Sequence, residues 1–224
     1  MAVLAGIWAG LVGLLIAAGE VVVHSDAVMN FDRHVTRVVV SARTPALDSV
    51  MKAATWLGSW VALVVTVVIV AVLVLTRYLP VLAAVVAVFA WAGEAGAVQI
   101  TKRVIARDRP PEAIRLVRAH GWSFPSGHTA AAALVFTVLA VCVAALARHR
   151  AIRILAGLIA GLAIAVTAFS RVELGVHWTT DVIASVVFVA SWLTAIAVLL
   201  GPPLRRAVDI VRQDDDTRTP SSRA

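Results

Sequence analysis

A histidine and an aspartate four residues apart are the first indication of chemistry in this chain. His177 and Asp181 become neighbours if their segment is helical, because residues i and i+4 lie one turn apart. The carboxylate can then orient the ring and stabilise its imidazolium form, which leaves the second ring nitrogen free as a base or nucleophile. A helix-start pair that only satisfies itself would have the same spacing, so other residues must decide between the two interpretations.

A second short motif could bind an anion beside such a histidine. Ser126, Gly127 and His128 follow a proline and precede a long apolar run, as expected at the start of a helix. Serine is a favoured N-cap, glycine lets a ligand approach the backbone closely, and a helix N-terminus attracts negative charge. The motif predicts an anion site with His128 at its edge, with simple helix capping as the alternative.

Three cations complete a candidate phosphate site. Lys102 and Arg109 are seven residues apart, so they would share one face if this segment were helical throughout. Arg171 follows another apolar run and is a third candidate. Arginine can bind two phosphate oxygens at once, whereas lysine acts as a point charge. We interpret Arg103 and Arg107 as cations of the membrane surface, outside the site.

Long apolar helices must position these residues. The chain has 224 residues, of which 61% are hydrophobic, and its mean hydropathy is +0.92, whereas soluble domains are about 45–50% apolar. A spanning helix needs about 20 mainly apolar residues, and the apolar runs lack the alternation of barrel strands. We therefore predict an all-α integral membrane bundle of six helices, forming a single domain over residues 1–203. The expected spans are Ala2–Val23, Trp56–Thr76, Leu79–Ile100, Thr129–Ala147, Ile154–Phe169 and Val182–Leu200.

Six spans would place both termini on one side of the membrane and all three motifs on the other. The connection His24–Thr55 has apolar residues at helical spacing, which predicts two short amphipathic helices in the interface, divided near Pro45. The polar segment 204–224 predicts a short helical extension followed by a disordered tail. The numbers of basic residues on the two sides do not decide the orientation. Three arginines crowd the loop Arg148–Arg153, and this density favours a cytoplasmic location for that loop and for the termini.

Charge and cysteine content restrict the possible partners. The net charge is +7, but the cations lie in loops beside apolar runs, so lipid headgroups explain them better than nucleic acid does. The single cysteine, Cys142, excludes an intrachain disulfide and a thiol-based zinc site. Glu94, within the third expected span, could support the site from behind, or could serve as an internal packing or ion-pairing residue.

Together the three motifs resemble the signature of the type 2 phosphatidic acid phosphatases, relatives of bacterial acid phosphatases and vanadium haloperoxidases. That signature is KxxxxxxRP, PSGH and SRxxxxxHxxxD, and every fixed position is present over residues 94–181 in the expected order and spacing. The resemblance implies that His177 is the nucleophile, oriented by Asp181, and that His128 protonates the leaving oxygen and later activates water. It also implies that the phosphate oxygens are held, without a metal ion or other cofactor, by Lys102, Arg109, Ser126, Gly127 and Arg171.

The resemblance leads us to expect a lipid phosphatase in a bacterial plasma membrane, with its active site on the extracytoplasmic side. Phosphatidic acid, phosphatidylglycerophosphate, diacylglycerol pyrophosphate and polyprenyl pyrophosphate all remain candidate substrates. One alternative is a lipid phosphotransferase that passes the phosphoryl group from the histidine to another hydroxyl. The other is a non-enzymatic protein that binds or transports lipid phosphates. The six expected spans disfavour a haloperoxidase.

Overall fold

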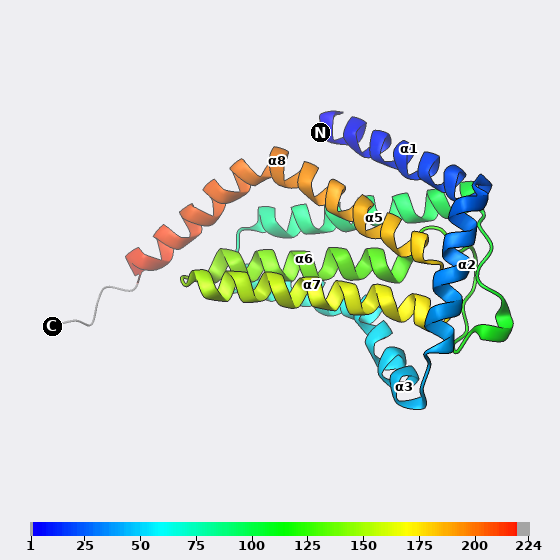
Figure 1. Cartoon of the computed structure of the whole chain (residues 1–224). Helices are drawn as coiled ribbons and strands as arrows, with labels where there is room; N and C mark the ends of the chain where they lie inside the picture. Colours follow the sequence, from blue (N-terminus) through cyan, green and yellow to red (C-terminus); the bar gives the residue numbers. More distant parts are fainter. Residues whose placement is uncertain (1, 219–224) are drawn as a thin grey trace.

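The protein's structure is a computed structural model that describes residues 2–218, and every regular element in this range is a helix (Figure 1). The prediction of an all-α membrane bundle is therefore confirmed. In chain order the elements are α1 (Ala2–His24), α2 (Asp26–Ser41), α3 (Pro45–Ala54), the 3-10 helix η1 (Thr55–Gly58), α4 (Trp60–Leu75), α5 (Val81–Ile105), the 3-10 helix η2 (Glu112–Ile114), α6 (Gly127–Leu146), α7 (Arg150–Glu173) and α8 (Thr179–Arg218).

Five helices in the described part of the chain are long and apolar enough to cross a membrane: α1, α5, α6, α7 and α8. The second predicted span corresponds to α4, which has 16 residues and meets the preceding α3–η1 segment at a bend of 45°. The fifth predicted span, Ile154–Phe169, is too short, because α7 has 24 residues. The helix includes basic residues at its start and polar residues at its end, so it reaches both interfaces.

Close packing locks α1, α5 and α8 together. A Cβ atom on Gly93 of α5 would lie 2.7 Å from the ring of Trp192 on α8, and the Trp192 indole donates to the Ala90 carbonyl at 3.0 Å. From α1, the Trp8 indole donates to the Gly93 carbonyl at 2.8 Å. In a bilayer such contacts hold helices together, because lipid tails are as apolar as the side chains. These contacts fix the middle of α5 relative to α1 and α8.

The two short helices α2 and α3 lie at one end of the bundle (Figure 1). Ser25 caps α2 and Thr44 caps α3, each accepting a hydrogen bond from the amide three residues further on. Pro45 occupies the first turn of α3, where its missing N–H costs no hydrogen bond. The predicted pair of helices, divided near Pro45, is confirmed.

The last helix, α8, extends beyond the expected sixth span. It continues through Pro202 and Pro203 to Arg218 and bends away from the bundle (Figure 1), as helices do at proline. Leu204, Val208 and Val211 are partly buried at spacings of four and three, so one apolar side continues past the prolines. The helical extension is longer than expected, and the disorder predicted after it concerns residues 219–224, outside the described range.

Candidate active site

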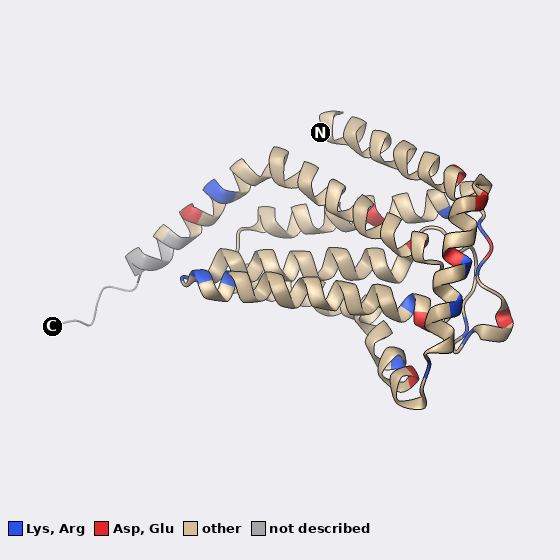
Figure 2. Cartoon of the chain, in the orientation of Figure 1, with Lys and Arg blue, Asp and Glu red and all other residues tan. Residues whose placement is uncertain are grey.

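The three motifs meet at the end of the bundle beside α2, where many of the charged residues are located (Figure 2). Lys102 lies in the last turn of α5 and Arg171 in the last turn of α7. Ser126 is the N-cap of α6, and Asp181 lies in the first turn of α8. His177 lies in the short connection between α7 and α8. Four helix ends thus bring together residues that are far apart in the sequence.

The predicted His177–Asp181 pair is present, and its partners define the state of the ring. Nδ1 of His177 lies 3.2 Å from Oδ2 of Asp181, while Nη1 of Arg109 lies 3.0 Å from Nε2. Because a guanidinium can only donate, Nε2 is the acceptor and Nδ1 carries the proton that Asp181 accepts. The lone pair of Nε2 therefore points toward Arg109 and the other cations.

The environment keeps His177 neutral. Burial lowers the pKa of His177 below its ordinary value of 6.5, and the positive charges of Arg109 and Arg171 add to this effect, while the hydrogen bond and charge of Asp181 oppose it. A neutral imidazole with one unprotonated nitrogen is the form that can attack an electrophile, and here that nitrogen, Nε2, accepts a hydrogen bond from Arg109.

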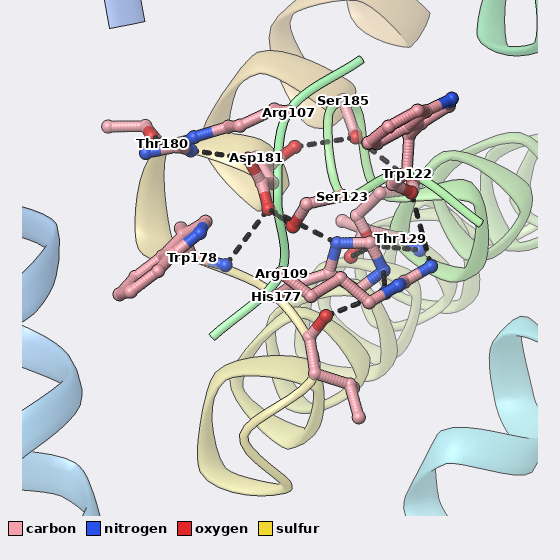
Figure 3. A network of polar contacts seen from close by, with 12 residues as sticks. Arg107, Arg109, Trp122, Ser123, Thr129, His177, Trp178, Thr180, Asp181 and Ser185 are labelled. Carbon is pink, nitrogen blue, oxygen red and sulfur yellow. Dashed lines mark hydrogen bonds and ion pairs between the residues drawn. The ribbon is translucent and has the colours of Figure 1, made fainter. Parts of the chain in front are cut away.

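The Asp181 carboxylate has partners on both oxygens (Figure 3). Oδ1 accepts from Nη1 of Arg107 at 2.5 Å. Oδ2 accepts from the Trp178 amide at 2.9 Å, from the Ser123 hydroxyl and from His177. These bonds fix the carboxylate, and through it the plane of the His177 ring.

Arg109 is held in front of His177 by backbone carbonyls (Figure 3). Its guanidinium donates to the carbonyl oxygens of Val176 at 2.6 Å and Gly121 at 2.9 Å, and to those of His120 and Trp122. Carbonyls orient a guanidinium without neutralising it, so its positive charge is kept for an anion. The His120 side chain is exposed, and only its backbone takes part.

The expectation that Lys102 and Arg109 share a helical face is wrong. α5 ends at Ile105 because Ala106 adopts a left-handed conformation with φ of +46°, and its amide donates to the Lys102 carbonyl. The chain then turns, and Arg109 reaches the site from a loop. Both cations still arrive at one place, since Nζ of Lys102 donates to the Trp122 carbonyl at 2.6 Å, a carbonyl that Arg109 also contacts.

Arg171 provides the third predicted cation and is buried, with 5% of its surface exposed. Nη1 donates to the hydroxyl of Thr55 in η1, while Nε has no hydrogen-bond partner in the described part of the chain. A buried donor without a partner is costly. The unpaired Nε of Arg171 fits a site that binds an anion, because a phosphate oxygen could accept a hydrogen bond from it.

The start of α6 has the predicted form. The Ser126 hydroxyl accepts from the Thr129 amide at 3.4 Å, and the Ser126 amide donates to the Asp181 carbonyl at 3.3 Å. A Cβ atom on Gly127 would meet Val98 only at 3.8 Å, so protein atoms do not fill the space beside Gly127. The ring of the half-buried His128 has no hydrogen bond with any residue in 2–218, and it lies within electrostatic reach of Arg171, Arg109 and Lys102.

The segment η1 forms a wall of the site that the sequence did not reveal. Thr55 binds Arg171, and a Cβ atom on Gly58 would lie 2.2 Å from the carbonyl oxygen of His128. Gly58 is therefore needed for the close approach between η1 and the first turn of α6. No motif spacing links these positions, so sequence reasoning had no signal for them.

Arg107 was misassigned as a surface cation. Only 4% of its surface is exposed, and its guanidinium bridges Asp181 and Asp32. Arg103 is exposed, as expected. Glu94 is buried in α5 but has no hydrogen bond or ion pair with any described residue, so its role near the site stays a prediction. Residues 2–218 contain no group of three His, Cys, Asp or Glu side chains that could hold a metal ion.

Comparison with known proteins assigns the family. A model of the PAP2 superfamily matches residues 75–206, which include all three motifs and more than half of the chain. The chain belongs to the PAP2 superfamily. The family inferred from the motifs is thus confirmed.

Relatives of known structure or activity agree with this assignment. Phosphatidylglycerophosphatase B of Bacillus subtilis is 33% identical over 175 residues, covering 76% of this chain and 82% of that protein. The crystal structure of a transmembrane PAP2-type phosphatidylglycerolphosphate phosphatase from Bacillus subtilis has a TM-score of 0.68 at 25% identity, covering 95% of this chain and 97% of that one. Aquifex aeolicus LpxE shares the fold, with a TM-score of 0.57 at 23% identity over 73% of this chain and 93% of its own. The protein is a multi-pass membrane protein of this fold.

Replacing Arg109 by lysine should impair turnover although the charge is kept. A single ammonium cannot replace the guanidinium contacts to His177 and the surrounding carbonyls, nor bind two phosphate oxygens at once. We expect a loss of roughly 2–4 kcal/mol of transition-state stabilisation, by analogy with removal of an oxyanion donor. The measurement is kcat/KM for phosphate release, with the exposed Arg103→Lys as the matched control. Equal kcat/KM values for the two variants would remove Arg109 from the site.

Proposed function

We propose that the protein is a metal-independent lipid phosphatase that hydrolyses phosphatidylglycerophosphate through a phosphohistidine on His177. The observation that carries this proposal is the 3.0 Å contact between Nε2 of His177 and Nη1 of Arg109. A phosphate oxygen that replaces Nε2 as the acceptor of this Arg109 hydrogen bond would place phosphorus directly in front of the lone pair of the neutral nitrogen. Asp181, on the opposite side of the ring, is placed to stabilise the positive charge that develops there.

In the first step, Nε2 of His177 bonds to phosphorus while the bond to the leaving lipid oxygen breaks, and His128 gives that oxygen a proton. In the second step, His128 takes a proton from water as the water oxygen attacks phosphorus, and the Nε2–phosphorus bond breaks. Phosphoryl transfer is promoted mainly by positioning and by charge stabilisation. Lys102, Arg109, Arg171 and the first-turn amides of α6 at Gly127 supply both.

The location of the site and the relatives support the proposed substrate class. The cation cluster lies at the ends of apolar helices, so a lipid could keep its acyl chains in the bilayer while its phosphate enters the site. Phosphatidylglycerophosphate is the first candidate because the curated relative is a phosphatidylglycerophosphatase. Phosphatidic acid, diacylglycerol pyrophosphate and polyprenyl pyrophosphate are the comparison substrates.

Purified protein in detergent should release phosphate from phosphatidylglycerophosphate faster than from the other three lipids. Release should persist in excess EDTA because side-chain cations meet the phosphate charge, and orthovanadate should inhibit because it can mimic the five-coordinate transition state. His177→Ala is the inactive control. Activity that EDTA abolishes and magnesium restores would contradict the mechanism. Transfer of phosphate to an added alcohol in preference to water would indicate the phosphotransferase, and binding without turnover the non-enzymatic alternative.

We further propose that the site faces the extracytoplasmic side of a bacterial plasma membrane, with both termini in the cytoplasm. The support is the arginine-rich turn between α6 and α7, at the end of the bundle opposite the site. With Cys142 replaced by alanine, a cysteine at exposed Arg118 should react with an impermeant reagent in intact cells, whereas one at exposed Arg150 should not. The reverse labelling pattern would place the site in the cytoplasm.

A further inference from the structure

Arg107 lies between two buried carboxylates, and only one of them belongs to the motifs. Its Nη1 is 2.5 Å from Oδ1 of Asp181, and its Nη2 is 2.7 Å from Oδ2 of Asp32 on α2. The side chains of both aspartates are completely buried, and 3% of the Arg107 side chain is exposed. The three groups therefore interact without screening by water.

Asp32 is also bonded to the start of α8. Its Oδ1 accepts from the Thr180 amide at 3.0 Å and its Oδ2 from the Thr180 hydroxyl at 2.5 Å, while the same hydroxyl accepts from Arg107 at 2.9 Å. A carboxylate at a helix N-terminus is stabilised by the helix dipole and the free amides. Asp32 thus contacts both Arg107 and Thr180, the residue that precedes Asp181 in the sequence.

The charge balance of this cluster affects the histidine. Two carboxylates and one guanidinium together carry one net negative charge, and His177 contacts this cluster through Asp181. Without Asp32, Arg107 alone would offset the charge of Asp181. In a buried site an opposite charge at 2.5 Å is weakly screened, so Asp181 would then stabilise a positive ring much less.

We infer that Asp32 is a positioning residue for catalysis, which acts through Arg107 to preserve the negative charge of Asp181 toward His177. This inference rests on the proposed function, because it concerns the step in which Nε2 bonds to phosphorus and the ring, still protonated at Nδ1, becomes positive. Asp32 itself does not touch His177. It makes α2, a helix outside the three motifs, part of the catalytic machinery.

The test distinguishes an effect of the Asp32 charge from simple loss of the contact between Asp32 and Arg107. Asp32→Asn keeps the shape of the side chain but removes its charge, leaving Arg107 to neutralise Asp181. We expect kcat and the single-turnover rate of phosphohistidine formation to fall roughly 10- to 100-fold, the range known for outer partners of metal-bound histidines, with KM changed little. Asp26→Asn, which removes a charge from an exposed position of the same helix, is the matched control and should behave like the wild type.

The double variant Asp32→Asn/Arg107→Gln decides the question. It restores one net negative charge at Asp181 while losing both ion pairs, so it should recover kcat severalfold over Asp32→Asn. If Asp32 had a purely structural role, the double variant would be slower than Asp32→Asn and would unfold at a lower temperature, and this result would overturn the inference. A kcat of Asp32→Asn equal to that of the wild type would also overturn it. In the same assay, the wild type and Asp26→Asn test the proposed function separately. If neither formed phosphohistidine, the proposed function would fail, and not only the inference about Asp32.

Discussion

The buried carboxylate of Asp181 is the group on which the geometry of the site depends. It accepts from Arg107 in the loop after α5, from Ser123 before α6, and from His177 and the Trp178 amide between α7 and α8. Removing one member of a buried ion pair costs about 3–5 kcal/mol because the remaining charge is left unpaired. One side chain thus joins the loops that carry all three motifs and also sets the tautomer of His177.

The membrane explains why such a polar centre can persist at the end of an apolar bundle. The helices pack through glycine, alanine and tryptophan contacts, as at Gly93 and Trp192, while the cations of the site lie in loops and at helix ends. Those loops are held by side chain to backbone bonds, such as those of Arg109 and Lys102 to the carbonyl of Trp122. The cations are therefore placed before any substrate arrives, which reduces the reorganisation needed during phosphoryl transfer.

Sequence reasoning succeeded where spacing along one element determines geometry. His177 precedes α8 by two residues and Asp181 lies in the first turn of that helix, so the four-residue spacing brings them together although His177 is not helical. Ser126 caps the helix that follows it. Local rules were therefore sufficient for both. It failed for Arg109, because the left-handed Ala106 ends α5 before the expected second turn. It also missed the bridge from Arg107 to Asp32, since these residues are 75 positions apart and only the packing of α2 against the site brings them together.

Formation of phosphohistidine on His177 is the central claim, and the two histidine variants test it most directly. With p-nitrophenyl phosphate the leaving group needs little protonation, so His128→Ala should release nitrophenol in a burst equal to the amount of enzyme. It should then accumulate acid-labile phosphate, because the second step lacks its base. His177→Ala should show neither the burst nor the bound phosphate. Phosphate trapped on His177→Ala, or no covalent phosphate on His128→Ala and the wild type, would contradict the account.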